Sequence, residues 1–242
     1  MEAKLKVITI GDYNISILKN YFKDNENIEF LKLALDESIE NLNTDFSKRD
    51  IVFLRTNAEN LEKLLEVGKA LKEKEIITVT ILEEKLAIEN KEVLENSIDT
   101  IFPVNKKDDI ENLFLELIKM IYNIIFERYY INLDVEDVKY MLKDSGISVF
   151  GSLNINKTIS KEDIIKNISY PFYPKNLKDS KKLLIFLDTL EGFVLTEGEL
   201  ITDTLRNESG KTIEDVLFSI RMANRLKNRI ECSFIAGVFK EE

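Results

Sequence analysis

Two aspartates, three residues apart, lie in the most distinctive polar run of this chain. Asp134 and Asp137 stand in Asn132-Leu-Asp-Val-Glu-Asp-Val138, between two helical patterns. The chain has no histidine, which excludes Ser-His and Cys-His dyads and histidine-containing zinc sites, and we predict no metal site. Carboxylates are therefore the groups that could do chemistry. The alternative is structural: Asp134 as the N-cap of a helix starting at Val135 would place Asp137 in its first turn.

The elements that must position these residues begin with alternating strand and helix patterns. Short apolar segments separated by amphipathic ones indicate a parallel sheet covered on both faces. Strands are predicted over 4–10, 28–35, 51–54, 76–82 and 98–104, with helices over 14–22 and 58–73.

The chain is expected to have three parts. Residues 1–107 form a degenerate nucleotide-binding-like domain, and 108–131 form a central connecting helix with a wide apolar stripe. Residues 132–242 form an α+β domain. Its predicted elements are strands over 147–155, 182–187, 216–222 and 230–238, and a helix near 161–169.

Composition narrows the function classes. The formal net charge of -10 opposes binding to nucleic acid, and the basic residues are interspersed with acidic or apolar ones. No signal peptide pattern opens the sequence, and the single Cys232 fits a reducing compartment, so we expect a cytoplasmic protein. Direct membrane insertion is not expected, because charged residues interrupt the most apolar helix: Glu111, Glu116, Lys119, Glu127 and Arg128.

Glycines are scarce where a phosphate-binding loop would need them. Such loops follow the carboxyl ends of parallel strands and use glycine for positive φ and for close approach to the anion. Before Gly146 only Gly11 and Gly68 are present, and Asp12 follows Gly11 directly. The first half is therefore not expected to be a self-sufficient nucleotidase.

The run Ile131-Asn-Leu-Asp-Val-Glu-Asp-Val-Lys139 resembles the N-L-D-F-x-D-V-K loop of FtsZ, the cell-division GTPase of the tubulin superfamily. Weaker likenesses follow in the family's order: 7–11 to V-I-G-V-G, 50–53 to D-M-V-F, 76–80 to L-T-V-A-V, 97–101 to V-D-T-L-I, 161–171 to a helix ending A-I-S-S-P, 182–187 to V-L-V-N-I, and 230–237 to V-T-V-V-A-T-G. The resemblance implies an α/β fold of the tubulin/FtsZ type: a parallel Rossmann-like sheet, a long central helix, then an α+β domain.

The sequence departs from FtsZ where that family binds GTP. The first phosphate loop keeps only Gly11, and the stretch Arg55-Thr-Asn-Ala-Glu-Asn-Leu61 has no glycine where the family has G-G-G-T-G-T-G. The segment between Leu35 and Asp50 is also much shorter than its counterpart. Together these changes predict that GTP binding is lost. They also predict that the chain has no catalytic residue for a nucleotide of its own.

The resemblance also implies a role for the retained loop. In the family it reaches into the GTP site of the next subunit, so Asn132, Asp134 and Asp137 are the candidate trans-acting residues. We expect a non-catalytic protein that binds FtsZ or itself through Asn132–Lys139 and modulates cell-division filaments, with no cofactor.

Three alternatives stay open. One is a self-assembling structural protein that needs no nucleotide. Another is a weak GTP site rebuilt around Asp12, Asn57 and Asn105, with Gly11, Asn57 and Asn105 as its vestigial positions. The third is that Asn132 and Asp134 only cap a helix.

Overall fold

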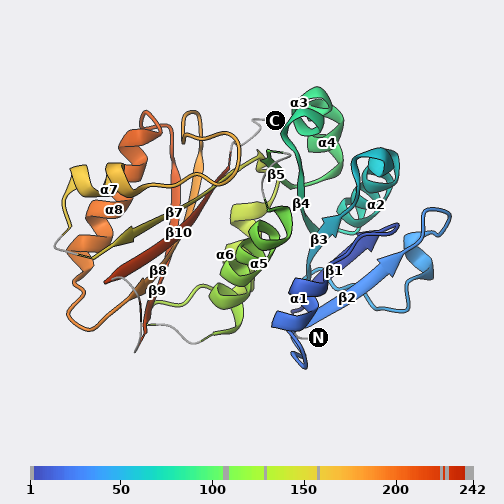
Figure 1. Ribbon diagram of the computed structural model, residues 1–242, viewed down its shortest axis with the longest axis horizontal. Helices are drawn as coiled ribbons and strands as arrows, with labels where there is room; N and C mark the ends of the chain where they lie inside the picture. The colour runs from blue at the N-terminus through green and yellow to red at the C-terminus, as the bar shows by residue number, and fades with distance from the viewer. Residues whose placement is uncertain are drawn as a thin grey trace. The chain divides into compact units, whose positions relative to one another are not determined.

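The structure is a computed structural model that describes residues 3–105, 109–127, 130–156, 159–223, 226 and 229–237. The chain divides into two compact units, Met1–Ile118 with Leu142–Ile147, and Lys119–Met141 with Ser148–Glu242. The division falls within helix α5 (Ile110–Phe126) (Figure 1). Residues 106–108 and 128–129, at the ends of the helix expected over 108–131, lie outside the described residues.

The first unit is built on a six-stranded sheet of order β2-β1-β3-β4-β5-β6, in which every pair of neighbours is parallel. Its strands β1, β3 and β5 are buried along their whole length, as a sheet covered on both faces requires. The strands are β1 (Leu5–Ile10), β2 (Ile28–Leu33), β3 (Ile51–Arg55), β4 (Ile77–Glu83), β5 (Thr100–Val104) and β6 (Gly146–Ile147).

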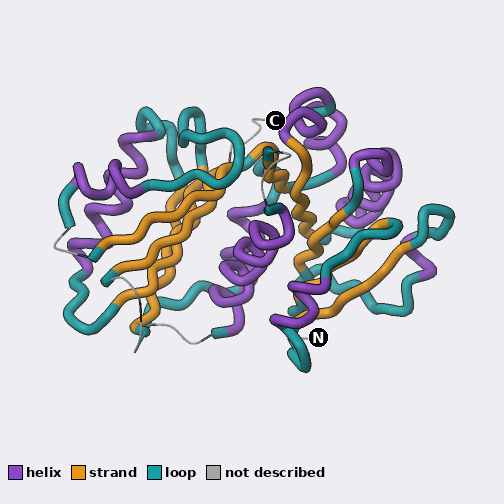
Figure 2. Tube along the Cα trace, in the orientation of Figure 1, coloured by secondary structure: helices purple, strands orange, loops and turns teal. Residues whose placement is uncertain are grey.

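Helices flank this sheet, as Figure 2 shows by colour. Leu64, Val67 and Leu71 pack from α2 onto one face, while Phe114 of α5 meets the ring of Phe53 on the other. The helices are α1 (Ser16–Tyr21), η2 (Ala58–Asn60), α2 (Leu61–Glu73), α3 (Glu84–Glu89) and α4 (Lys91–Ser97). The connection from β2 to β3 contains only the short turn η1 (Ile39–Asn41).

The second unit has a four-stranded sheet of order β7-β10-β8-β9, in which β10 runs antiparallel to both neighbours and β8 is parallel to β9. Ile164 of α7 and Ile201 and Leu205 of α8 bury one face of it. Its elements are α6 (Val135–Leu142), β7 (Val149–Ile155), α7 (Lys161–Asn167), β8 (Lys182–Thr189), α8 (Leu195–Glu208), β9 (Asp215–Met222) and β10 (Ile230–Gly237).

Three features differ from the sequence expectation. Helices α3 and α4 lie between β4 and β5, where no helix was predicted. The single strand expected over 147–155 is divided at Ser148: β6 pairs with β5 of the first sheet, and β7 pairs with β10 of the second. Helix α8 was not predicted, because Gly198 and several threonines weaken its helical signal. Among the described residues, no helix is long and apolar enough to cross a membrane.

Candidate functional site

The carboxyl edge of the first sheet is where the sequence places a possible nucleotide site. Gly11, Asn57 and Asn105 all follow strand ends there, after β1, β3 and β5. Gly11 has a φ of +71°, and a β-carbon on it would lie 3.2 Å from the Asn60 amide nitrogen. Gly11 is thus a tightly packed turn residue, with side chains where a phosphate loop would leave its backbone open.

Asp12 is turned to solvent at this edge. Its carboxylate pairs with the Lys32 ammonium at 2.7 Å, and this hydrogen bond and charge lower the pKa of Asp12. The Asn57 amide lies 3.5 Å from the Asp12 carbonyl oxygen. Asp12 and Asn57 are therefore brought together, and Asn105 directly follows the end of β5.

Arg55 occupies the middle of the edge, and sequence reasoning missed its role. Only 5% of this last residue of β3 is exposed. Its Nη1 donates to the carbonyl oxygens of Thr56 (3.1 Å) and Ile81 (2.9 Å), and its Nη2 donates to the Tyr13 hydroxyl (2.5 Å). The Tyr13 ring also lies over the guanidinium, 4.2 Å from Cζ. One side chain thus ties together the ends of β3 and β4 and the loop after β1.

Burial affects the charge of Arg55. It lowers the pKa of the guanidinium, while the Tyr13 hydroxyl and the charges of Glu111 and Glu83 act in the opposite direction. Arginine nonetheless remains protonated in proteins. The edge therefore contains a buried cation. The signal available in the sequence for this buried cation was an arginine as the last residue of an otherwise apolar strand.

One pocket at this edge lies beside Arg55 and is small. The pocket beside Arg55 has a volume of about 170 Å³, below the range of roughly 300–1,000 Å³ that is usual for ligand pockets. It does not include Gly11, Asp12 or Asn105. Its lining residues are Tyr13, Arg55, Thr56, Asn57, Ala58, Leu82, Glu83, Leu86 and Ile110.

The 132–139 loop lies in the second unit, at the start of α6. The Asp137 amide donates to Asp134 Oδ1 (2.9 Å), and the Asp134 amide donates to Asp137 Oδ2 (3.0 Å). This reciprocal pair is a capping box. Each carboxylate uses one oxygen for it, and neither second oxygen has a hydrogen bond within the described part of the chain. The arrangement therefore caps the helix and still presents two charged oxygens.

The other end of α6 is anchored to the second sheet. Lys182, only 3% exposed, donates from Nζ to the Tyr140 carbonyl oxygen at 2.7 Å and lies 4.5 Å from the centre of the Tyr140 ring. The Tyr140 hydroxyl donates to Asp215 Oδ2 at 2.6 Å. A cation at the last carbonyls of a helix also interacts favourably with its dipole. The loop is thus presented from a helix fixed at both ends.

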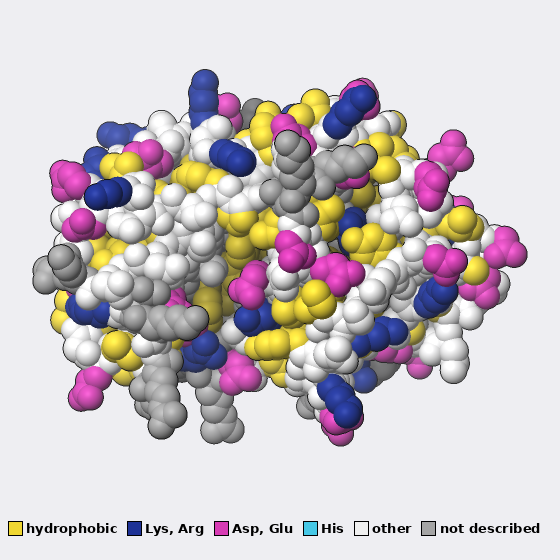
Figure 3. Space-filling view, in the orientation of Figure 1, with side chains coloured by type: hydrophobic (Ala, Val, Ile, Leu, Met, Phe, Trp, Pro, Cys, Tyr) yellow, Lys and Arg dark blue, Asp and Glu magenta, His cyan; other side chains and the backbone are white. Residues whose placement is uncertain are grey.

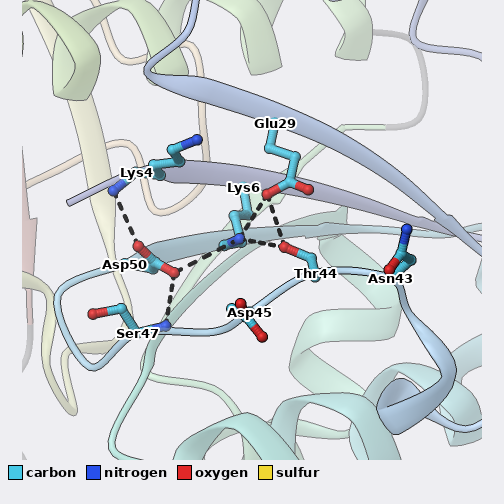
Figure 4. Close-up of a pocket in the computed structure, with 8 residues that line it drawn as sticks. All are labelled: Lys4, Lys6, Glu29, Asn43, Thr44, Asp45, Ser47 and Asp50. Atoms are coloured by element: carbon cyan, nitrogen blue, oxygen red, sulfur yellow. Dashed lines mark hydrogen bonds and ion pairs between the residues drawn. The ribbon is translucent and has the colours of Figure 1, made fainter. Parts of the chain in front are cut away.

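A larger cavity of about 560 Å³ lies at the opposite, amino edge of the first sheet (Figure 4). At its base, buried Lys6 donates to Glu29 (2.6 Å) and Thr44 (2.5 Å) and lies 3.8 Å from Asp50. The surrounding residues are polar throughout: Lys4, Lys6, Glu29, Asn43, Thr44, Asp45, Ser47 and Asp50.

This network holds the loop that crosses the sheet. Asp50 accepts hydrogen bonds from the backbone amides of Lys4 (3.0 Å) and Ser47 (2.9 Å). Burial raises the pKa of Glu29, but hydrogen bonds from Lys6 and Thr44 and nearby positive charge outweigh it, so the net shift is downward. We interpret these contacts as structural, because they replace the packing that a crossover helix would supply.

No group of three or more Cys, Asp or Glu side chains able to hold a metal ion occurs within the described residues. On the face drawn in Figure 3, the described basic and acidic side chains are interspersed over each unit, in keeping with the net charge of -10.

No protein-family model and no curated protein sequence matches this chain. Solved structures do match over nearly its whole length. An FtsZ mutant from M. jannaschii aligns with a TM-score of 0.67 at 14% identity, over 97% of this chain and 91% of that one. An empty FtsZ dimer from the same organism gives 0.70 at 15%, over 98% and 88%. The TubZ of GDP-form protofilaments from Bacillus thuringiensis serovar israelensis gives 0.62 at 11%, over 97% and 84%.

These likenesses establish the fold. The chain has the two-domain α/β fold of FtsZ and TubZ, so the fold class that the sequence indicated is confirmed. At 11–15% identity the similarity concerns architecture alone.

Proposed function

We propose that this chain is a non-catalytic FtsZ-like protein that docks through its Asn132–Lys139 loop, onto an FtsZ filament or onto a second copy of itself, and modulates filament assembly in cell division. The observation that carries the proposal is a contrast between two places in the fold. At the nucleotide edge Arg55 and Tyr13 pack across the strand ends and the pocket beside them is small, while the loop offers free carboxylate oxygens from a firmly anchored helix.

The filled edge supports the non-catalytic part. Arg55 at the end of β3 meets Tyr13 of the loop after β1, and the pocket of about 170 Å³ beside them is too small for a nucleoside triphosphate. Asp12, whose carboxylate is turned to solvent and paired with Lys32, follows Gly11 directly, where a phosphate loop would continue with glycine. The expected absence of a bound cofactor rests on these residues.

The loop supports the docking part. The capping bonds fix the directions of Asp134 and Asp137, so a partner would meet a preorganised pair of charges and not a mobile segment. Solved structures with this fold include an FtsZ dimer and TubZ protofilaments. An assembly partner of the same fold is therefore the natural candidate.

Co-sedimentation with assembled FtsZ tests the proposal, together with the GTP turnover of that FtsZ. We expect the chain to sediment with the polymer and to change its turnover in proportion to the amount added. The matched variants are Asp134→Asn with Asp137→Asn, which keep the capping acceptors and lose the charges. The proposal is refuted if the wild-type chain does not co-sediment with FtsZ and also does not self-associate.

Self-assembly without nucleotide is the second candidate, favoured because head-to-tail contacts between like subunits need not close. Sedimentation velocity over a range of protein concentrations distinguishes it: mass should rise with concentration in the absence of any nucleotide. A strict monomer at high concentration would exclude this candidate and leave docking onto FtsZ.

A rebuilt GTP site is the third candidate, favoured only by the proximity of Asp12 and Asn57. Isothermal titration with GTP and GDP in the presence of magnesium decides it. The non-catalytic proposal expects no binding heat and no nucleotide-dependent rise in melting temperature. Saturable binding of GTP or GDP would overturn the non-catalytic proposal and favour a rebuilt GTP site.

A further inference from the structure

The cavity at the amino edge of the first sheet is large enough for a small organic molecule. It lies between the starts of β1 and β2 and the connection from β2 to β3 (Figure 4), wholly within the first unit. Parallel strands are usually joined through a helix, but this connection contains only the short turn η1. The volume of about 560 Å³ falls within the range of roughly 300–1,000 Å³ that is usual for ligand pockets.

The base of this cavity is already satisfied by the protein. The Lys6 ammonium donates to Glu29 at 2.6 Å and to Thr44 at 2.5 Å. It also lies 3.8 Å from Asp50, whose two oxygens accept from backbone amides. A ligand would gain little from these groups, because each bond to it would replace one inside the protein. The base is therefore a fixed floor, and recognition falls to the other lining residues.

Two charged side chains of the lining are uncommitted. Neither the Lys4 ammonium nor the Asp45 carboxylate makes a hydrogen bond or an ion pair within the described part of the chain. Figure 4 shows them on opposite sides of the Lys6 network, Lys4 at the start of β1 and Asp45 in the loop. Burial raises the pKa of Glu29, but hydrogen bonds and the positive charges of Lys6 and Lys4 lower it. The Lys4 charge thus acts inside the cavity.

We propose that this cavity binds a small amino acid, with its carboxylate towards Lys4 and its ammonium towards Asp45. Opposite charges held apart in one cavity are complementary to a zwitterion, whose own charges are separated. A simple anion or a simple cation would leave one of the two side chains facing a like charge. The Asn43 amide and the Ser47 hydroxyl line the same cavity and offer hydrogen bonds to a polar ligand side chain. The site goes beyond the proposed docking function, whose loop belongs to the other unit.

Isothermal titration of the whole chain with four molecules of similar size tests the proposal, at pH 7 and one fixed ionic strength. L-serine carries both charges, ethanolamine lacks the carboxylate, glycerate lacks the ammonium, and glycerol lacks both. L-serine should bind saturably and about fivefold more tightly than ethanolamine or glycerate, as the loss of one exposed ion pair predicts. No saturable binding of L-serine would overturn the proposal. Equal or tighter binding of any of the other three would also overturn it.

Two substitutions assign the two ends of the ligand. Lys4→Met should bind L-serine no better than ethanolamine, and Asp45→Asn should bind it no better than glycerate, because each removes one ion pair. Lys69→Met and Asp36→Asn make the same changes outside the cavity and should keep the wild-type preference. All four side chains are exposed, so each variant should melt close to wild type. A wild-type preference retained by either cavity variant would contradict the assigned orientation and overturn the site.

Discussion

Asp134 and Asp137 each accept a hydrogen bond from the other's backbone amide, at 2.9 and 3.0 Å, and so close the first turn of α6. Capping and docking were competing explanations for these acids. The geometry makes them compatible, because each carboxylate commits one oxygen to the helix. Charge and capping can therefore be separated by substitution.

The aspartate pair gives the first prediction. Asp134→Ala with Asp137→Ala should lower the free energy of unfolding by about 1–2 kcal/mol, because both capping acceptors are lost. Asp134→Asn with Asp137→Asn keeps acceptors and should cost well under 1 kcal/mol. Urea unfolding measures both. Docking predicts that the Asn pair loses the partner response despite its stability; a full response from that pair would leave capping as the only role.

Lys6 gives the second prediction. Lys6→Met should destabilise the first unit by about 2 kcal/mol, since buried Asp50 and partly buried Glu29 lose their cation while the cavity still admits water. Lys4→Met is the matched control, because Lys4 contributes its backbone amide, not its side chain, to Asp50. Thermal unfolding compares the two. Equal melting temperatures for both variants would contradict the anchoring role of Lys6.

Two glycines of the second unit give predictions of opposite sign. A β-carbon on Gly151 of β7 would overlap the ring of Phe234, so Gly151→Ala should cost about 1–3 kcal/mol. At Gly198 of α8 the nearest atom would be Phe193 Cζ at 3.5 Å, an ordinary contact. Gly198→Ala should therefore stabilise by about 0.5–1 kcal/mol through helix propensity. Chemical denaturation of both variants checks the signs.

Glu197 gives a pH-dependent prediction. The hydrogen bond from Arg229 at 2.7 Å lowers the pKa of Glu197 below its usual 4.5, although burial opposes the shift. A carboxyl whose pKa is lower in the folded state stabilises fully above its unfolded pKa and loses this contribution as pH falls through the folded value. Glu197→Gln should thus cost about 1 kcal/mol at pH 7.

The difference between Glu197→Gln and wild type should shrink steadily below about pH 4.5. Exposed Glu199→Gln serves as the control and should match wild type throughout. Melting temperatures measured across pH 3–8 check this. A difference that stays constant over the whole range would mean that Glu197 acts by packing and not by its charge.

The strands of the first sheet differ in how well the sequence predicts them. Short apolar segments in the sequence predicted five of the six strands of the first sheet at nearly their observed positions. A strand buried on both faces is apolar along its length, so it can be recognised locally. The short strand β6 was not separable from β7, since its partner β5 lies more than forty residues earlier. Periodicity records which residues are buried and not which segments they pair with.

The same limit governs the candidate site. The sequence alone determined the fold class, the scarcity of glycine at the strand ends and the spacing of Asp134 and Asp137, because these depend on residues close together in the chain. Only the tertiary structure decided that Arg55 meets Tyr13 and the Ile81 carbonyl and leaves Nε unpaired. Those partners come from separate strands and loops, and the burial that makes an unpaired donor costly exists only once the sheet has formed.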